Sequence, residues 1–115
     1  MALHRSEKIH ELVRKTASEF IARESNPGTL ITVTDVTQDA TGLRVEILVS
    51  TYPAHQGQAA IDFLNRRASD FQHFFTEKVK IRKAPFFTFE IDRGEKNRQR
   101  VDELLGSLVP PPENK

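Results

Sequence analysis

The chain has 115 residues, a net charge of +1 and no cysteine. This length fits one domain, and the absence of thiols excludes disulfides, thiol catalysis and thiolate metal sites. No apolar run approaches the ~18 residues of a membrane-spanning helix, and the first residues lack the apolar core of a signal peptide. We therefore expect a cytoplasmic protein with no membrane partner.

Charge is distributed unevenly along the chain. Residues 16–62 contain two cations and six acids, whereas residues 78–100 contain eight cations and three acids. This asymmetry favours a polyanionic partner for one side of the molecule. A solvated surface with a chance cluster explains the charges equally well.

The first half of the chain predicts a helix followed by a hairpin. Ser6 can cap a helix that runs to about Glu24 and carries one apolar stripe, and Asn26-Pro27-Gly28 ends it. Residues 30–37 and 43–50 predict two strands, because they are rich in β-branched residues or alternate apolar and polar side chains. In the second strand, one face is expected to carry Leu43, Val45, Ile47 and Val49.

The second half predicts a kinked helix, a strand and a last helix. Apolar spacing over residues 58–79 is typical of a helix packed on a sheet. The weakly helix-favouring step Ala68-Ser69-Asp70 predicts a kink. Pro85 fits only at a strand start or edge, so it begins a strand over 86–91. Alternation in this half-buried strand places Phe87, Phe89 and Ile91 on one face. A turn at Arg93-Gly94 and a helix over 96–108 follow.

This element order predicts an α+β fold, with helices covering one face of a three-stranded sheet. The domain is expected to span residues 5–108, and residues 109–115 form a flexible, proline-rich C-terminal tail.

No motif indicates catalysis or a cofactor. The chain lacks glycine-rich phosphate loops and a G-x-S-x-G turn, and its four histidines never fall at i, i+4. The strand acids Asp35, Glu46, Glu90 and Asp92 could pair for acid–base work, but outward-facing strand charges explain them more simply. We expect no enzyme activity, no cofactor, no metal and no small-molecule substrate.

Several short motifs occur in an order typical of one family. They are Val33-Thr34-Asp35-Val36, the kink step, Ile81-Arg82 four residues before Phe86, Phe89-Glu90-Ile91-Asp92 and Val101-Asp102-Glu103-Leu104-Leu105. From about Arg5 to Leu108, this arrangement resembles the ribosome-binding factor A family. The resemblance implies a type II KH-like fold in the order α-β-β-α-(kink)-α-β-α, with an Ala-x-Gly step in place of the usual G-x-x-G loop.

The resemblance also implies a function. Members are non-catalytic assembly factors that bind the small ribosomal subunit and its rRNA during late maturation and assist rRNA processing. We expect a monomer. Asp70 stands where the family has glycine. Aspartate tolerates left-handed conformations and can cap a helix, but its carboxylate would repel phosphate.

Cations on rigid elements are the candidates for rRNA binding. They are Arg5, Lys8, Arg66, Arg67, Lys78, Lys80, Arg82 and Lys83. A KH-like arrangement would bring Arg66, Arg67, Lys80, Arg82 and Lys83 close together. A solvated helix face explains Arg66 and Arg67 equally well, whereas the family motif includes Arg82.

Two aromatic residues are candidates for stacking on RNA bases. They are Tyr52, in a loop, and Phe86, for which packing inside the protein is the favoured interpretation. We therefore expect recognition of rRNA shape and backbone.

Two other function classes remain open. A KH-like module that binds a protein partner, or dimerises without binding RNA, would show weak salt dependence and an exposed apolar patch. A small hydrolase or isomerase would need a concave pocket with converging polar groups, which the sequence does not indicate.

Overall fold

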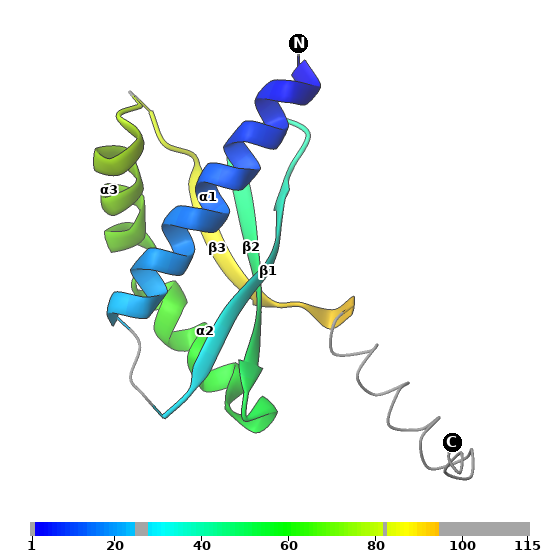
Figure 1. Cartoon of the computed structure of the whole chain (residues 1–115), viewed down its shortest axis with the longest axis vertical. Helices are drawn as coiled ribbons and strands as arrows, with labels where there is room; N and C mark the ends of the chain where they lie inside the picture. The colour runs from blue at the N-terminus through cyan, green and yellow to red at the C-terminus, as the bar shows by residue number, and fades with distance from the viewer. Residues whose placement is uncertain (1, 25–27, 82, 95–115) are drawn as a thin grey trace, which may run out of the picture.

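A computed structural model describes residues 2–24, 28–81 and 83–94, and for residues 2–7 the backbone only. Its elements are α1 (Ala2–Glu24), β1 (Leu30–Gln38), β2 (Arg44–Tyr52), the 3-10 turn η1 (Ala54–Gln56), α2 (Gly57–Arg66), α3 (Ala68–Val79) and β3 (Phe86–Ile91) (Figure 1). The predicted α+β class and element order are confirmed through β3. The predicted helix over 96–108 and the tail at 109–115 lie outside the described residues.

The sheet has the strand order β1-β2-β3. β1 pairs with β2 antiparallel, and β2 pairs with β3 parallel. Parallel neighbours need a crossover connection, which α2 and α3 supply. Val45, Ile47 and Val49 of β2 are buried together with Phe87 and Phe89 of β3. The alternation read from the sequence therefore identified the face that the helices cover.

Aromatic rings join α1, α3 and β3. The fully buried Phe71 has ring-centroid distances of 5.3 Å to Phe20, 4.7 Å to Phe87 and 5.9 Å to Phe89, all in edge-to-face geometry. Such pairs contribute about 0.5–1.5 kcal/mol each beyond their buried area. Phe71 thereby fixes α3 against both the first helix and the sheet.

Side chains bond to the backbone of β3 at its outer edge and of the segment just before it. The Asn65 amide Nδ2 donates to the Phe89 carbonyl at 3.0 Å, and the Phe89 N–H donates to Asn65 Oδ1 at 2.9 Å. Gln72 Nε2 donates to the carbonyls of Ala84 and Pro85 at 3.3 and 2.9 Å. These bonds occupy backbone groups that a further strand would need, so they protect the edge from intermolecular pairing.

The helical pattern predicted for 58–79 is interrupted at Arg67. The backbone there has φ −104° and ψ 11°, between α2 and α3. The interruption precedes the predicted kink step by one residue, because Ala68, Ser69 and Asp70 form the first turn of α3. A carboxylate is favoured in a first helical turn by the helix dipole, so Asp70 needs no left-handed conformation.

Two smaller differences concern element ends. α1 begins at Ala2 rather than Ser6, since Ala2 and Leu3 favour helix more strongly than a cap at Ser6 favours a start. Arg93 and Gly94 have helical conformation instead of forming a turn.

Candidate nucleic-acid interface

The cations that sequence reasoning selected do not form one cluster. Lys80 and Lys83 follow the C-terminal end of α3, whereas Arg66 and Arg67 precede its N-terminal end. α3 has 12 residues, and at 1.5 Å per residue it separates the two groups by about 18 Å. The expected proximity of Arg66 and Arg67 to Lys80 and Lys83 is therefore wrong (Figure 1).

Arg67 is engaged within the fold. Its Nη1 lies 2.9 Å from Glu24 Oε1 at the end of α1 and 3.9 Å from Asp70 Oδ2. Its guanidinium carbon also lies 5.3 Å from the centroid of the Phe63 ring. Arg67 thus holds the α2–α3 junction against α1 and is less available to a phosphate than the exposed Arg66.

Lys8 lies at the same end of the molecule as Lys80 and Lys83. Its neighbour Ile9 lines a pocket together with Lys83. Lys15 is on the same side of α1 as Lys8, because seven residues make nearly two helical turns. All four lysines are exposed. Sequence reasoning did not select Lys15, although this lysine shares the exposed side of α1 with Lys8.

The chain leaves α3 through a left-handed residue. Lys80 has φ 61° and ψ 46°, and its N–H donates to the Thr76 carbonyl at 2.8 Å. A cap of this kind satisfies a carbonyl at the helix end and turns the chain sharply. Arg82 lies outside the described residues, as does the side chain of Arg5, so their assigned roles stay predictions.

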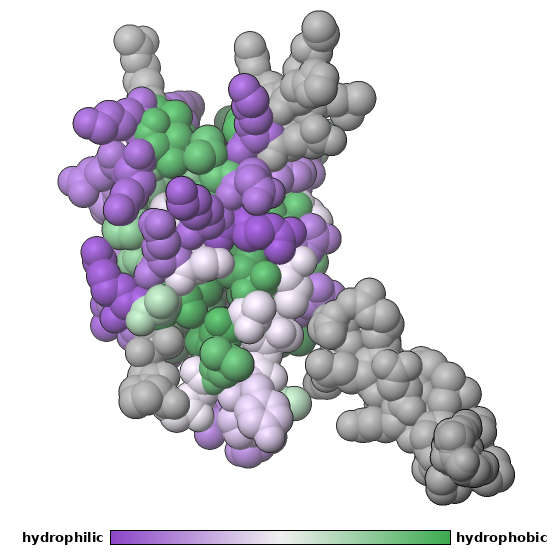
Figure 2. Space-filling model, in the orientation of Figure 1, coloured by the Kyte–Doolittle hydropathy of each residue, from purple (hydrophilic) through white to green (hydrophobic). Residues whose placement is uncertain are grey.

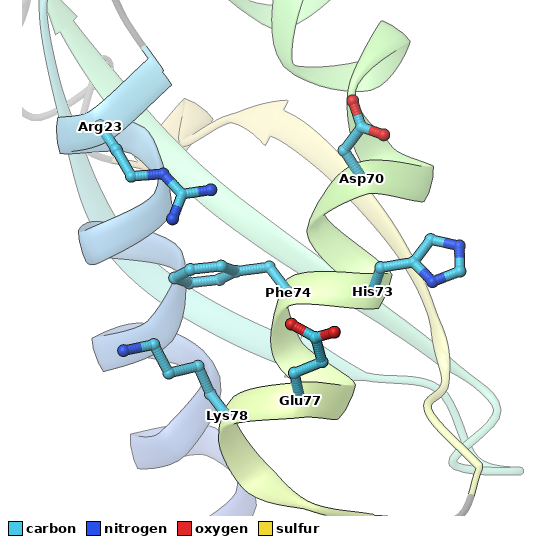
Figure 3. Close-up of a pocket in the computed structure, with 6 residues that line it drawn as sticks. All are labelled: Arg23, Asp70, His73, Phe74, Glu77 and Lys78. Carbon is cyan, nitrogen blue, oxygen red and sulfur yellow. The ribbon is translucent and has the colours of Figure 1, made fainter.

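Phe74 connects two cations from different helices. The Arg23 guanidinium carbon lies 4.7 Å from the Phe74 ring centroid, and Lys78 Nζ lies 5.5 Å from it. Figure 3 shows the ring directed from α3 toward α1, with Arg23 on one side and Lys78 on the other. Sequence reasoning missed Arg23 because the surrounding sequence is acidic. Its spacing of three residues from the buried Phe20 is the signal that could have placed it beside α3.

Arg23, Phe74 and Lys78 line a pocket of about 400 Å³. The carboxylates of Asp70 and Glu77 line it with Arg23 and Lys78, so its local charge is nearly balanced. His73 points away from the Phe74 ring in Figure 3. The positive charge is therefore less opposed near Lys80 and Lys83 than in this pocket.

The open face of the sheet has the opposite charge. Asp35, Leu48 and Glu90 lie in one row across the three strands, and Glu46 lies in the next row. Arg44 is the one cation within the three strands as the structure describes them. A phosphate backbone would be repelled there. The open sheet face is thus acidic apart from Arg44, whereas the helices carry cations and acids in similar numbers.

Two further properties concern the described part of the chain. Within residues 2–24, 28–81 and 83–94, no group of three or more His, Cys, Asp or Glu side chains is placed to hold a metal ion. No helix in these ranges has both the length and the apolar composition needed to cross a membrane.

Proteins of one family resemble this chain along nearly its whole length. The sequence model of the family described as ribosome-binding factor A matches residues 5–105. A protein of that name from Protochlamydia amoebophila is 31% identical over 114 residues, which cover 95% of this chain and 86% of the relative. Another, from Desulforamulus reducens, is 26% identical over 109 residues, or 91% of this chain and 90% of the relative.

Solved structures share the fold. The crystal structure of ribosome-binding factor A from Thermus thermophilus superposes with a TM-score of 0.67 at 19% identity, covering 76% of this chain and 96% of the other. A homology model of the Thermus thermophilus factor, fitted into the cryo-EM map of a 30S complex, gives a TM-score of 0.62 at 22% identity. That match covers 71% of this chain and 89% of the other.

Proposed function

The chain belongs to the ribosome-binding factor A family, and we propose that it binds the small ribosomal subunit as a non-catalytic assembly factor. The factor from Thermus thermophilus that was fitted into a map of a 30S complex supports this partner. In this proposal the protein acts as a cytoplasmic monomer during late maturation, contacts small-subunit rRNA and assists its processing. It uses no cofactor and converts no small molecule.

The observation that carries the proposal is the contrast between exposed lysines around the first half of α1 and the C-terminal end of α3 and an open sheet face that carries three acids. Lys8, Lys78, Lys80 and Lys83 are exposed on the helical side, while Asp35, Glu46 and Glu90 lie on the open face of the sheet. Polyanionic RNA would therefore approach the helices and the segment that leads into β3. Arg5 and Arg82 adjoin this surface in the sequence, and Arg23 extends it along α1.

The N-terminal end of α3 has a different role in this proposal. Arg66 is exposed and supplies a more distant phosphate contact. Arg67 positions α1, α2 and α3 relative to one another. Asp70, whose side chain is 65% exposed, places a carboxylate next to the helix junction and disfavours phosphate there. The rRNA backbone is thus expected nearer the C-terminal end of α3.

The expected mode of recognition is by shape. Lysines held on helices and in a short loop meet phosphates, and phosphate contacts fix orientation without reading sequence. Specificity would then come from the folded rRNA surface, which places several phosphates at the spacing of these cations.

The test is co-sedimentation of the full chain with purified small and large subunits across a salt series. We expect binding to small subunits only, with the logarithm of the affinity falling linearly as the logarithm of salt concentration rises. The slope should correspond to about 0.7–0.9 per neutralised phosphate. Salt-independent binding, or equal binding to both subunits, would contradict the proposal.

A protein partner is the second candidate, favoured by one observation. Leu30 and Tyr52 are register neighbours on β1 and β2, and they are 66% and 75% exposed. Such a pair is a suitable contact for an apolar protein surface. This alternative predicts that Tyr52→Ala, and not a lysine substitution, abolishes binding to the subunit.

A further inference from the structure

A second pocket lies at the end of the molecule that carries Lys8, Lys80 and Lys83. It has a volume of about 430 Å³ and lies between the first half of α1, the end of α3, the segment before β3 and the β1–β2 hairpin. The volume is in the range of pockets that bind small organic ligands. Figure 2 shows hydrophobic side chains reaching the surface among hydrophilic ones at this end.

Apolar side chains around this pocket are exposed. Leu12 is 41%, Leu43 is 55% and Phe86 is 67% exposed, and all three line it. Sequence reasoning favoured packing for Phe86, but the first residue of β3 is mainly uncovered. Three of the five large hydrophobic side chains exposed in the described residues thus meet at one concavity, which is typical of a binding site.

The polar groups at this pocket are cationic or neutral. Lys83 is the one charged side chain among the described residues that line it. Lys8 and Lys80 each adjoin a lining residue in the sequence, Ile9 and Val79. Gln38 also lines the pocket, and its amide can both donate and accept a hydrogen bond. A complementary ligand has a flat apolar body, a hydrogen-bonding edge and an attached negative charge.

We propose that this pocket takes one unpaired nucleobase of RNA. The base would lie against Leu12, Leu43 and Phe86, with Lys83 on an adjoining phosphate and Gln38 on the edge of the base. The inference rests on the proposed function, because the lysines proposed to contact rRNA phosphates would also contact the phosphate next to the bound base. It adds a splayed base to an interface that otherwise contacts only the rRNA backbone.

Nucleotide titration tests the pocket without the ribosome. Adenosine, guanosine, cytidine and uridine 5′-monophosphates are added separately to the full chain with labelled Ile and Leu methyl groups, and NMR shifts are followed. Saturable shifts are expected for at least one nucleotide at Ile9, Leu12, Leu43 and Ile81, and not at Leu30 at the far end of β1. Ribose 5-phosphate, which lacks a base, should leave these methyl groups unshifted. Equal shifts with ribose 5-phosphate, or none at the pocket with any nucleotide, would overturn the proposal.

Matched variants test the pocket with RNA. Phe86→Ala and Leu43→Ser alter the pocket, while the controls Leu30→Ser and Leu30→Ala truncate a leucine of similar exposure at the far end of β1. We expect the pocket variants to bind a single-stranded RNA octamer about fivefold or more weakly, since stacking of one base supplies at least that factor. The control variants should bind like the parent protein, and an abasic octamer should bind all proteins alike. Equal loss in pocket and control variants would contradict the assignment.

The subunit assay separates this inference from the proposed function. If the parent protein co-sediments with small subunits but binds base-containing and abasic octamers equally, the pocket assignment falls and the proposed function stands. A benzophenone amino acid at position 86 identifies the occupant in the bound complex. Cross-links to rRNA support the nucleobase, and cross-links only to a ribosomal protein overturn it.

Discussion

Arg67 and Glu24 connect the junction of α2 and α3 to the end of α1, with 2.9 Å between Nη1 and Oε1. The two side chains are 43% and 21% exposed, so the pair is partly shielded from solvent. Both belong to segments that end there: Glu24 is the last residue of α1, and Arg67 interrupts the helical pattern. The ion pair therefore fixes the relative placement of three helices on which the basic surface is built.

Arg67→Ala should destabilise the protein more than Arg66→Ala does. Loss of the charged hydrogen bond and the contact with Phe63 is expected to cost about 1–2 kcal/mol in the free energy of unfolding, after allowance for partial exposure. The exposed Arg66 should contribute within about 0.5 kcal/mol. Urea unfolding of both variants provides the comparison, and equal losses would refute the structural role of Arg67.

Lys80→Gly should separate stability from RNA binding. Glycine adopts the left-handed conformation of residue 80 without strain, so the free energy of unfolding should rise by about 0.5–1 kcal/mol. Removal of the exposed cation should at the same time weaken binding to small subunits. Lys83→Ala is the control, with weaker binding and unchanged stability. If Lys80→Gly instead lowered the free energy of unfolding, that result would contradict a left-handed residue 80 at the end of α3.

Arg23→Ala should weaken binding to small subunits across all salt concentrations and reduce the salt slope by about one phosphate contact. Phe74 places this α1 side chain beside Lys78, on the helical side of the molecule. Arg93→Ala removes an exposed cation that follows β3, at the end of the strand away from Phe86, and should bind like the parent protein. Identical behaviour of the two variants in a salt series would exclude Arg23 from the interface.

The β1–β2 hairpin should become less stable in acid. The pKa of Asp39 lies below its ordinary value of 3.8, chiefly because Thr41 donates a hydrogen bond to the carboxylate, with further bonds from the backbone of Arg44 and Gly42. A lowered native pKa means that the ionised carboxylate stabilises the folded state above the unfolded pKa. This contribution is lost as the pH falls through the native pKa.

The variant Asp39→Asn tests that dependence. It should melt at a lower temperature than the parent protein at pH 7, and the difference should shrink as the pH falls below about 3.8. Thermal unfolding of both proteins at pH 7 and in acid measures this difference in melting temperature. Asp62→Asn, on an exposed helix face, is the control. A difference that grows in acid would contradict the assigned direction.

Asn65→Ala should expose the edge of β3. Two hydrogen bonds to the Phe89 backbone are lost, so we expect about 1–2 kcal/mol of destabilisation. The freed backbone groups should also promote association at high protein concentration. Gln58→Ala removes a local, exposed hydrogen bond to Asp62 and serves as the control. An Asn65→Ala protein that stays as stable and as monomeric as this control would show that the edge needs no protection.

Periodic features of the fold were predictable from the sequence. The alternation in β2 and β3 identified Val45, Ile47, Phe87 and Phe89 as buried, because every second side chain of a strand faces the same way. The kink was also predictable, since weak helix formers interrupt a long apolar pattern. Its position shifted by one residue to Arg67, whose partner Glu24 is distant in the sequence.

Features that depend on contacts between distant segments were not predictable. Arg23 and Lys78 share the Phe74 ring only because α1 packs beside α3. The separation of Arg66 from Lys83 follows from the length of α3, which no motif encodes. Phe86 is exposed although its strand is apolar, because it lies at the beginning of β3 with its side chain away from the buried face.

The most direct test of the central claim compares two charge reversals in one assay. Lys83→Glu and Arg93→Glu each change the net charge by two, but Lys83 precedes the first residue of β3 and Arg93 follows its last residue, at the opposite end of the strand. Co-sedimentation with small ribosomal subunits at moderate salt should show a loss of affinity of about fivefold or more for Lys83→Glu, and a small change for Arg93→Glu. Equal losses, or a greater loss for Arg93→Glu, would contradict an rRNA interface at the end of the molecule that carries Lys83.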